Sequence, residues 1–300
     1  MKPKLLWAMM MTFFIMGGFL AAVFWIALMI FGVSGLPMLI GIVGFVGVMI
    51  GIQWAISPSL IKRMTGAKEC KDPRIKQMVH DLAEEAGIPK PEVYIVEKES
   101  PNAFAFGRTQ KSSAVALHKG LIEKLNNDEL KGVIAHEVGH IKHRDTTVMT
   151  IASALPMILF YVVFFGSMMA GGRRSRGTGF IGAWIGGMIA QFIGSLIVMY
   201  LSRVREYYAD THSAYLTGNP EGLANALNKI TSYKPRKSPA RARGRRKKNQ
   251  PGGNMMKNFY IAEPSKRKAS VKKAKSSFAE LFMSHPLPEK RIKNLKNIEV

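Results

Sequence analysis

A chain of 300 residues is long enough for one compact domain together with several membrane-spanning helices. Hydrophobic residues make up 47% of it, yet its formal net charge is +23, so apolar and basic segments must alternate along the sequence. The charge favours anionic partners, either nucleic acid or anionic lipid headgroups. The one cysteine, Cys70, excludes both an intrachain disulfide and a CxxC metal site.

The first 61 residues are predicted to form a membrane hairpin. No charged residue occurs from Leu5 to Ile61, and this stretch far exceeds the roughly 20 residues that one span needs. Glycines and Pro37 divide it, which predicts one span at 5–31 and another at 37–56. The apolar stretch is also too long for a cleaved signal peptide, so we expect it to be retained as a membrane anchor.

Residues 62–145 are predicted to form a soluble domain with a small sheet. Apolar residues recur at helical spacing over 73–87, and short apolar strands are expected over 91–97, 102–107 and 113–117. The strand that contains Asn102, Ala103, Phe104 and Ala105 is a candidate substrate-binding strand, because an extended peptide can add to a sheet edge. Alternatively Phe104 and Phe106 pack a core, and both roles are compatible because alternate residues of a strand face opposite sides.

The sharpest chemical signal is His136-Glu137-Val138-Gly139-His140, in a helix that opens at Asn126 with a capping box to Glu129. Histidines at i and i+4 share one helical face and can point both imidazoles at a single metal ion. Glu137 is then placed to take a proton from a water molecule whose pKa a zinc ion lowers towards about 7. Apolar residues that would bury the other helical faces disfavour the alternative of two surface histidines.

Two further uncharged segments, 146–172 and 177–202, are each long enough to span a membrane. Lysines and arginines flank the outer ends of both apolar pairs, so the positive-inside rule places the 62–145 domain in the cytoplasm. If both segments cross fully, the short loop between them places Arg173, Arg174 and Arg176 on the far side of the membrane, against this rule. Full crossing is favoured, with a re-entrant hairpin as the alternative.

The next segment, 202–216, is predicted to be a helix that supplies a third metal ligand. Catalytic zinc takes three protein ligands and keeps one open position. Glu206 is the best candidate, and Asp210 one turn later is placed to accept the second ring N–H of a ligating histidine. The alternatives are a surface pair of Arg205 with Glu206, and His212 as the ligand. Because His140 and Glu206 each lie a few residues from an apolar segment, we expect the metal within roughly 10 Å of the membrane.

A helix opened by Asn219 and Pro220 follows, and a short helix ends the chain. Between them lies a basic insert, 234–275, whose proline and glycine content predicts a disordered or extended surface loop. We expect it to bind anionic lipid, with a merely solvated loop as the alternative. Specific nucleic-acid binding is not expected, because the sequence contains no nucleic-acid fold motif.

Four motifs in order, PNAFAFG, HEVGH, SRVREYYADTHSA and SHPLPEKRI, resemble the HtpX-type heat-shock membrane metalloproteases. These are gluzincins related to the CaaX prenyl endoproteases, and the resemblance covers nearly the whole chain apart from the basic insert. It implies a zinc-dependent endopeptidase with one Zn²⁺ held by His136, His140 and Glu206, and with Glu137 as the base. His285 resembles the late histidine of the family, which would donate to the oxyanion with help from Arg291; a plain loop histidine is the alternative.

The expected fold is therefore a mainly helical α+β integral membrane protein, with four transmembrane helices and a minimal zincin-like cytoplasmic catalytic domain that contains a small sheet. Its parts are 1–61, 62–145, 146–202 and 203–300. The expected function is cleavage of misfolded or damaged membrane proteins on the cytoplasmic side of the inner (plasma) membrane, as part of quality control and stress response. The competing hypotheses are a scaffold whose structural zinc is closed by His212 or His285, and a membrane protein that tethers nucleic acid.

Overall fold

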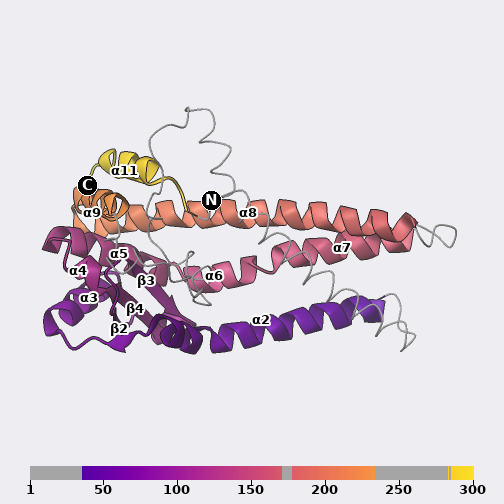
Figure 1. Ribbon diagram of the computed structural model, residues 1–300, viewed down its shortest axis with the longest axis horizontal. Coiled ribbons are helices and arrows are strands. Elements are labelled where there is room, and N and C mark those ends of the chain that lie inside the picture. Colours follow the sequence, from indigo (N-terminus) through magenta and orange to yellow (C-terminus); the bar gives the residue numbers. More distant parts are fainter. Residues whose placement is uncertain (1–35, 171–177, 234–282, 284) are drawn as a thin grey trace, which may run out of the picture. The chain divides into compact units, whose positions relative to one another are not determined.

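The computed structural model describes residues 36–170, 178–233, 283 and 285–300, and the chain divides into two compact units. The helical unit contains the residues up to Gln53 together with Thr150–Val198. The mixed unit contains Trp54–Met149 and Met199–Val300. Two long helices, α2 (Leu36–Thr65) and α8 (Thr178–Thr217), each contribute residues to both units (Figure 1).

In the helical unit, α7 (Leu155–Ala170) packs closely on the first half of α8. A Cβ atom added at Gly187 would lie 2.9 Å from the ring of Phe160, and one added at Gly194 would lie 2.8 Å from Cα of Pro156. Away from this contact, an isoleucine at every fourth position of α8 is exposed: Ile181, Ile185, Ile189, Ile193 and Ile197. Such an apolar stripe is expected where a helix faces lipid.

Among the described residues, two helical stretches are long and apolar enough to cross a membrane, Asp145–Met168 and Gly179–Thr217. The first combines α6 (Asp145–Ala152) with α7, and the helix is interrupted just before Pro156. The predicted span at 37–56 lies within α2, whereas 5–31 and the basic insert 234–275 lie outside the described residues. The count of four spans and the extended form of the insert therefore stay predictions.

The mixed unit contains a four-stranded sheet in the order β1-β2-β4-β3. Its strands are β1 (Lys68–Glu69), β2 (Glu92–Val96), β3 (Ala103–Gly107) and β4 (Ser113–His118). β2 and β4 are parallel and the other pairs are antiparallel. The three predicted strands are confirmed, whereas the two residues of β1 are too few to give a periodic signal. Of the four strands, only β4 pairs with β3, so β3 is an edge strand.

The sheet has a hydrophobic core on each face. On one face, residues such as Val115 and Leu117 join the main core of the unit. The helices that contribute to that core are α3 (Pro73–Glu85), α4 (Lys119–Ile122), α5 (Asn127–Lys142), α9 (Pro220–Ser232), α11 (Pro288–Lys296) and the end of α8. On the other face, Phe104 and Phe106 pack with Ile61 and Ala67 at the end of α2. Phe104 and Phe106 therefore have the core role expected from their spacing.

The predicted capping box at the start of α5 is confirmed. The Asn126 side chain accepts from the Glu129 backbone N–H at 2.9 Å, and the Glu129 carboxylate accepts from the Asn126 backbone N–H at 2.9 Å. Glu129 also binds Lys229 Nζ of α9 at 2.7 Å. Glu129 thus caps the start of α5 and also binds α9, so the helix that carries the histidines is fixed at its N-terminus.

Candidate metal centre

Helix α5 places His136 and His140 on one face, with their Nε2 atoms 3.1 Å apart. Two glycines let the neighbouring helices approach this helix closely. A Cβ atom at Gly132 would lie 2.7 Å from the backbone nitrogen of Leu223 in α9, and one at Gly139 would lie 3.0 Å from the ring of His212 in α8. Helix α5 is therefore held from two sides, and His136 is only 1% exposed.

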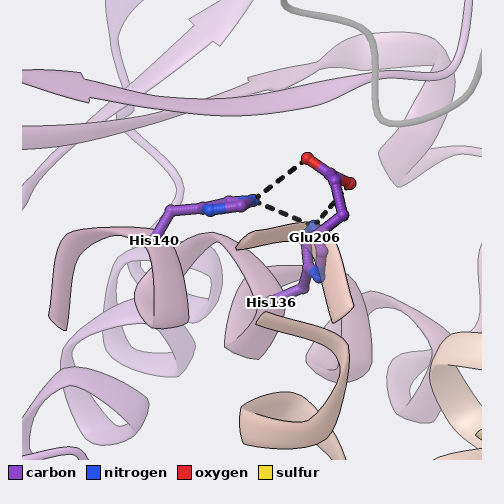
Figure 2. Close-up of side chains that lie close together, drawn as sticks. All are labelled: His136, His140 and Glu206. Carbon is purple, nitrogen blue, oxygen red and sulfur yellow. Dashed lines mark hydrogen bonds and ion pairs between the residues drawn. The ribbon is translucent and has the colours of Figure 1, made fainter. Parts of the chain in front are cut away.

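The second half of α8 presents Glu206, Asp210 and Ser213 to α5, at the spacing of one helical face. Ser213 Oγ donates to the Gly132 carbonyl at 2.7 Å, which fixes how the two helices align. The Glu206 carboxylate oxygens then lie 3.8 Å from His136 Nε2 and 3.7 Å from His140 Nε2. Figure 2 shows the two imidazoles and the carboxylate converging on one space.

This arrangement fits a single tetrahedral zinc ion. Ligand atoms about 2.05 Å from a tetrahedral ion are separated by roughly 3.4 Å. The two Nε2 atoms are 3.1 Å apart, and a different Glu206 oxygen is nearest to each of them, Oε2 at 3.8 Å from His136 and Oε1 at 3.7 Å from His140. One ligand atom of each residue lies within 4.8 Å of the others. His136, His140 and Glu206 supply two imidazoles and one carboxylate, a donor set that zinc binds in hydrolytic enzymes. Three protein ligands leave a fourth position for water or substrate.

A carboxylate lies beside the Nδ1 atom of each ring. His136 Nδ1 lies 3.0 Å from Asp210 Oδ1, and His140 Nδ1 lies 2.6 Å from Asp145 Oδ2, where it forms a hydrogen bond. An ionised carboxylate only accepts hydrogen bonds, so a carboxylate at this place favours the proton on Nδ1 and leaves Nε2 to present a lone pair. That is the tautomer in which an imidazole binds a metal ion through Nε2.

Arg291 of α11 connects the carboxylates behind the histidines. Its Nε and Nη2 atoms donate to Asp210 at 2.8 and 2.6 Å, and its Nη1 atom lies 2.9 Å from Glu206 Oε2. Its Nη2 atom is also 3.4 Å from His136 Nε2. The guanidinium is 1% exposed, so a planar, permanently charged group holds a ligand carboxylate and the partner of a ligand histidine together.

Two carboxylates of the site are held in the ionised form although they are buried. Burial alone would raise the pKa of Glu206, but His285 and Arg291 outweigh it and hold that pKa well below its usual range. Burial is likewise outweighed at Asp210, whose pKa is lowered by Arg291 and His136. An ionised carboxylate is the form that binds a metal cation or accepts from a histidine N–H.

The remaining residues expected at the site are placed as follows. Glu137 is buried beside the ligands in α5, and His285 Nδ1 lies 3.1 Å from Glu206 Oε1. Ala103 and Ala105 on β3 contribute to the core that includes α5, and Asn102 is buried just before the strand. His212 is outside the ligand cluster; its ring instead lies 5.4 Å from that of His143.

The sequence interpretation missed Asp145 and the position of Arg205. Arg205 forms an ion pair with Asp145 and donates to the His143 carbonyl at 2.6 Å, so it does not form the surface pair with Glu206 considered above. The chain reverses after α5 at Arg144, whose φ is 55°, and this turn brings Asp145 back to His140. A carboxylate five residues after the second histidine is the one local signal that could have identified it.

Comparison with known proteins agrees with this geometry. The model of the Peptidase family M48 matches residues 69–299. Protease HtpX homolog 2 of Methanosarcina mazei is 36% identical over 269 residues, covering 86% of this chain and 84% of that protein. Protease HtpX homolog of Methanothermobacter thermautotrophicus is 40% identical over 230 residues, covering 76% of this chain and 86% of that protein.

A solved structure shares the fold. The crystal structure of S. mikatae Ste24p superposes with a TM-score of 0.60 at 19% sequence identity, covering 95% of this chain and 64% of that one. The described helices, the small mixed sheet and the ligand cluster thus occur in a chain whose sequence is similar to HtpX proteases over most of its length. On these grounds the chain belongs to peptidase family M48 and is a membrane metalloprotease of the HtpX type.

Proposed function

We propose that this protein is a zinc-dependent endopeptidase that cleaves misfolded or damaged membrane proteins on the cytoplasmic side of the inner membrane. The observation that carries the proposal is the convergence of His136, His140 and Glu206 on one site, because three protein ligands are the number that a catalytic zinc ion takes. When bound, the zinc ion would polarise the scissile carbonyl and lower the pKa of an attacking water.

The protein's own residues have distinct parts in this reaction. Glu137 accepts the proton of the attacking water and passes it to the leaving amine, as expected for a buried carboxylate beside the ligands. Asp210 and Asp145 hold the two imidazoles in the tautomer that presents Nε2. His285, beside Glu206, donates a hydrogen bond to the developing oxyanion.

Substrate binds as an added strand along β3. The strand lies at the sheet edge, and a pocket lined by Phe106 and Gly107 of β3 and by His140 and Ile141 of α5 adjoins it. Backbone hydrogen bonding along Asn102, Ala103, Phe104 and Ala105 gives affinity with little sequence selectivity, which suits an enzyme that removes damaged proteins. The small side chains of Ala103 and Ala105 keep this strand close to α5.

The position of the ligands along the chain supports action at the membrane surface. Glu206 follows the uncharged segment that ends at Ser202 by four residues of the same helix, which is about 6 Å along the helix axis. His140 precedes Thr146, the start of the other uncharged segment, by six residues. A site so close to the bilayer meets loops and segments that leave it, and the membrane raises their local concentration. The basic insert 234–275 adds affinity for anionic lipid.

Replacing the proposed base tests the mechanism. We expect Glu137→Gln to retain one zinc per chain and to lose proteolysis of an unfolded substrate by at least about 10²-fold, since amides do not take up the proton. Purified full-length protein in detergent is analysed for zinc by atomic emission, and casein cleavage is measured with and without chelator. The exposed neighbour variant Lys131→Gln is the control. Casein cleavage by Glu137→Gln at the wild-type rate would refute this role.

A further inference from the structure

We propose that the mixed unit contains a built binding site for the phosphate group of an anionic phospholipid, separate from the catalytic centre and from the basic insert. The site is a cavity of about 200 Å³ between the end of α2, the start of β2 and the turn after β3. Its charged lining residues are Lys62, Lys90, Glu92, Arg108 and Lys111, four basic and one acidic.

Two of these basic side chains are free to bind an anion. Lys62 Nζ lies 3.0 Å from Glu92 Oε2 and contacts the Tyr94 hydroxyl, and Lys90 Nζ lies 3.0 Å from Glu84 Oε2. Arg108 and Lys111 have no acidic partner among the residues that the structure describes. Lys62 and Lys90 are therefore each matched by a carboxylate, and Arg108 and Lys111 leave a local excess of positive charge among the lining residues.

The turn that carries these two cations is ordered by its own hydrogen bonds. It contains a short 3-10 helix, η1 (Gln110–Ser112), with reciprocal contacts between Thr109 and Ser112. Ser113 Oγ donates to the Gln110 carbonyl at 2.7 Å, and Gln110 Nε2 donates to the Lys142 carbonyl at 2.8 Å. Arg108 and Lys111 therefore project from a fixed loop, and a bound anion need not order it.

The surroundings indicate that the anion is a lipid headgroup. The long uncharged stretch of the sequence ends at Ile61, and Lys62 is the first charged residue after it. We therefore expect the cavity to lie where the chain leaves the hydrocarbon core of the membrane. The last turns of α2 still expose apolar side chains four residues apart, Ile56, Leu60 and Met64. The Arg108 guanidinium lies 6.0 Å from the ring centroid of Trp54, an aromatic residue of the kind enriched at membrane interfaces.

The donors that line the cavity suit a phosphodiester group. A guanidinium binds two phosphate oxygens at once, and Lys111 supplies a second, pointlike charge. The wall also offers Ser59 and Ser112 hydroxyls as further donors. We therefore expect one tightly bound anionic phospholipid at this site, in addition to any diffuse attraction of lipid by the insert.

The test is lipid binding by full-length protein in detergent, measured by native mass spectrometry. Short-chain phosphatidylglycerol, phosphatidylcholine of the same chain length and inorganic phosphate are titrated in parallel. Each basic residue near an anionic lipid surface contributes about a factor of five in affinity. The double variant Arg108→Gln with Lys111→Gln should then bind one phosphatidylglycerol roughly 30-fold more weakly. The variant Arg108→Lys keeps the charge, so its affinity for phosphatidylglycerol should fall much less.

The control is Lys71→Gln with Lys131→Gln, which removes two exposed positive charges elsewhere on the same unit. The proposal is overturned if the affinity for phosphatidylglycerol falls as much in this control as in the test variant, because diffuse charge would then explain the binding. It is also overturned if inorganic phosphate binds as tightly as the lipid, or if phosphatidylcholine does. The zinc content should be unchanged in every variant, so failure here is separable from failure of the proposed catalytic mechanism.

Discussion

At the residue scale, each histidine of the candidate metal site contacts a carboxylate, and each of these carboxylates contacts an arginine. One chain of contacts runs from His136 through Asp210 to Arg291, and the other from His140 through Asp145 to Arg205. The arginines offset the charge of the buried carboxylates, and the carboxylates contact the Nδ1 side of both imidazoles, so that the Nε2 atoms face the ligand cluster. The geometry of the candidate metal site therefore depends on residues outside that cluster.

The partner of His140 provides a prediction at this scale. Asp145→Asn replaces an acceptor-only group by an amide that no longer forces the proton onto His140 Nδ1, and it leaves Arg205 without its carboxylate. We expect zinc affinity to fall about 10- to 100-fold, as is typical when such a partner is lost. Competition with a fluorescent chelator measures the dissociation constant.

An exposed aspartate gives the matched control, because Asp81→Asn removes the same charge from α3. Zinc affinity that is unchanged in Asp145→Asn, or that falls equally in Asp81→Asn, would contradict a specific role for Asp145 in orienting His140.

The part of this site that depends on contacts within a few residues of sequence could be predicted, and the part that depends on distant contacts could not. His136 and His140 follow from helical spacing, and the start of their helix follows from Asn126 and Glu129, because both are contacts within a few residues. Asp145 depends on a backbone reversal at Arg144, and Arg291 reaches Asp210 across 81 residues of sequence. No periodicity encodes such contacts. The sequence offered Arg291 only as an aid to His285 and left its role open; in the structure its nitrogens contact the carboxylates of Asp210 and Glu206.

At the scale of elements, α5 is the helix of the mixed unit on which the other elements of the site pack. It packs on α9, α3, β3 and the second half of α8, and glycines make the closest of these contacts possible. Gly132 faces the backbone of Leu223, and Gly222 on α9 faces the Asp128 carbonyl, with a Cβ there lying 2.8 Å from that oxygen. Two glycines thus set the distance between α5 and α9, and the ligand positions follow from that distance.

A methyl group at this crossing should therefore be costly. Gly132→Ala places Cβ against backbone atoms of α9, which cannot rotate away, so we expect a loss of roughly 1–3 kcal/mol in unfolding free energy together with weaker zinc binding. Thermal unfolding in detergent, followed by circular dichroism, measures the first effect. The control is Gly51→Ala in α2, where a Cβ meets no atom within 4 Å and helix propensity favours alanine by up to about 1 kcal/mol. Equal melting temperatures for the two variants would show that the crossing tolerates the added methyl.

At the scale of the whole molecule, the sequence separates apolar and basic segments, and the structure places them in two units that share α2 and α8. The exposed isoleucine stripe lies on the part of α8 within the helical unit, and the metal ligand Glu206 lies on the part within the mixed unit. One helix thus carries both an exposed apolar stripe and a residue of the candidate metal centre.

The orientation of the chain across the membrane gives the last prediction. The positive-inside rule places the mixed unit in the cytoplasm, although Arg173, Arg174 and Arg176 oppose it if segments 146–172 and 177–202 cross fully. In a background that replaces the buried Cys70 by alanine, Glu85→Cys and Ser175→Cys each place one thiol in α3 or in that arginine-containing loop. Full crossing predicts that a membrane-impermeant maleimide labels Ser175→Cys from outside intact cells and labels Glu85→Cys only in inverted vesicles. Lysis with detergent should expose both thiols equally, which controls for reactivity. Labelling of both positions from the cytoplasmic side would instead mean that the second apolar pair enters and leaves the membrane on one side, because a crossing hairpin cannot return its loop to the face from which it started.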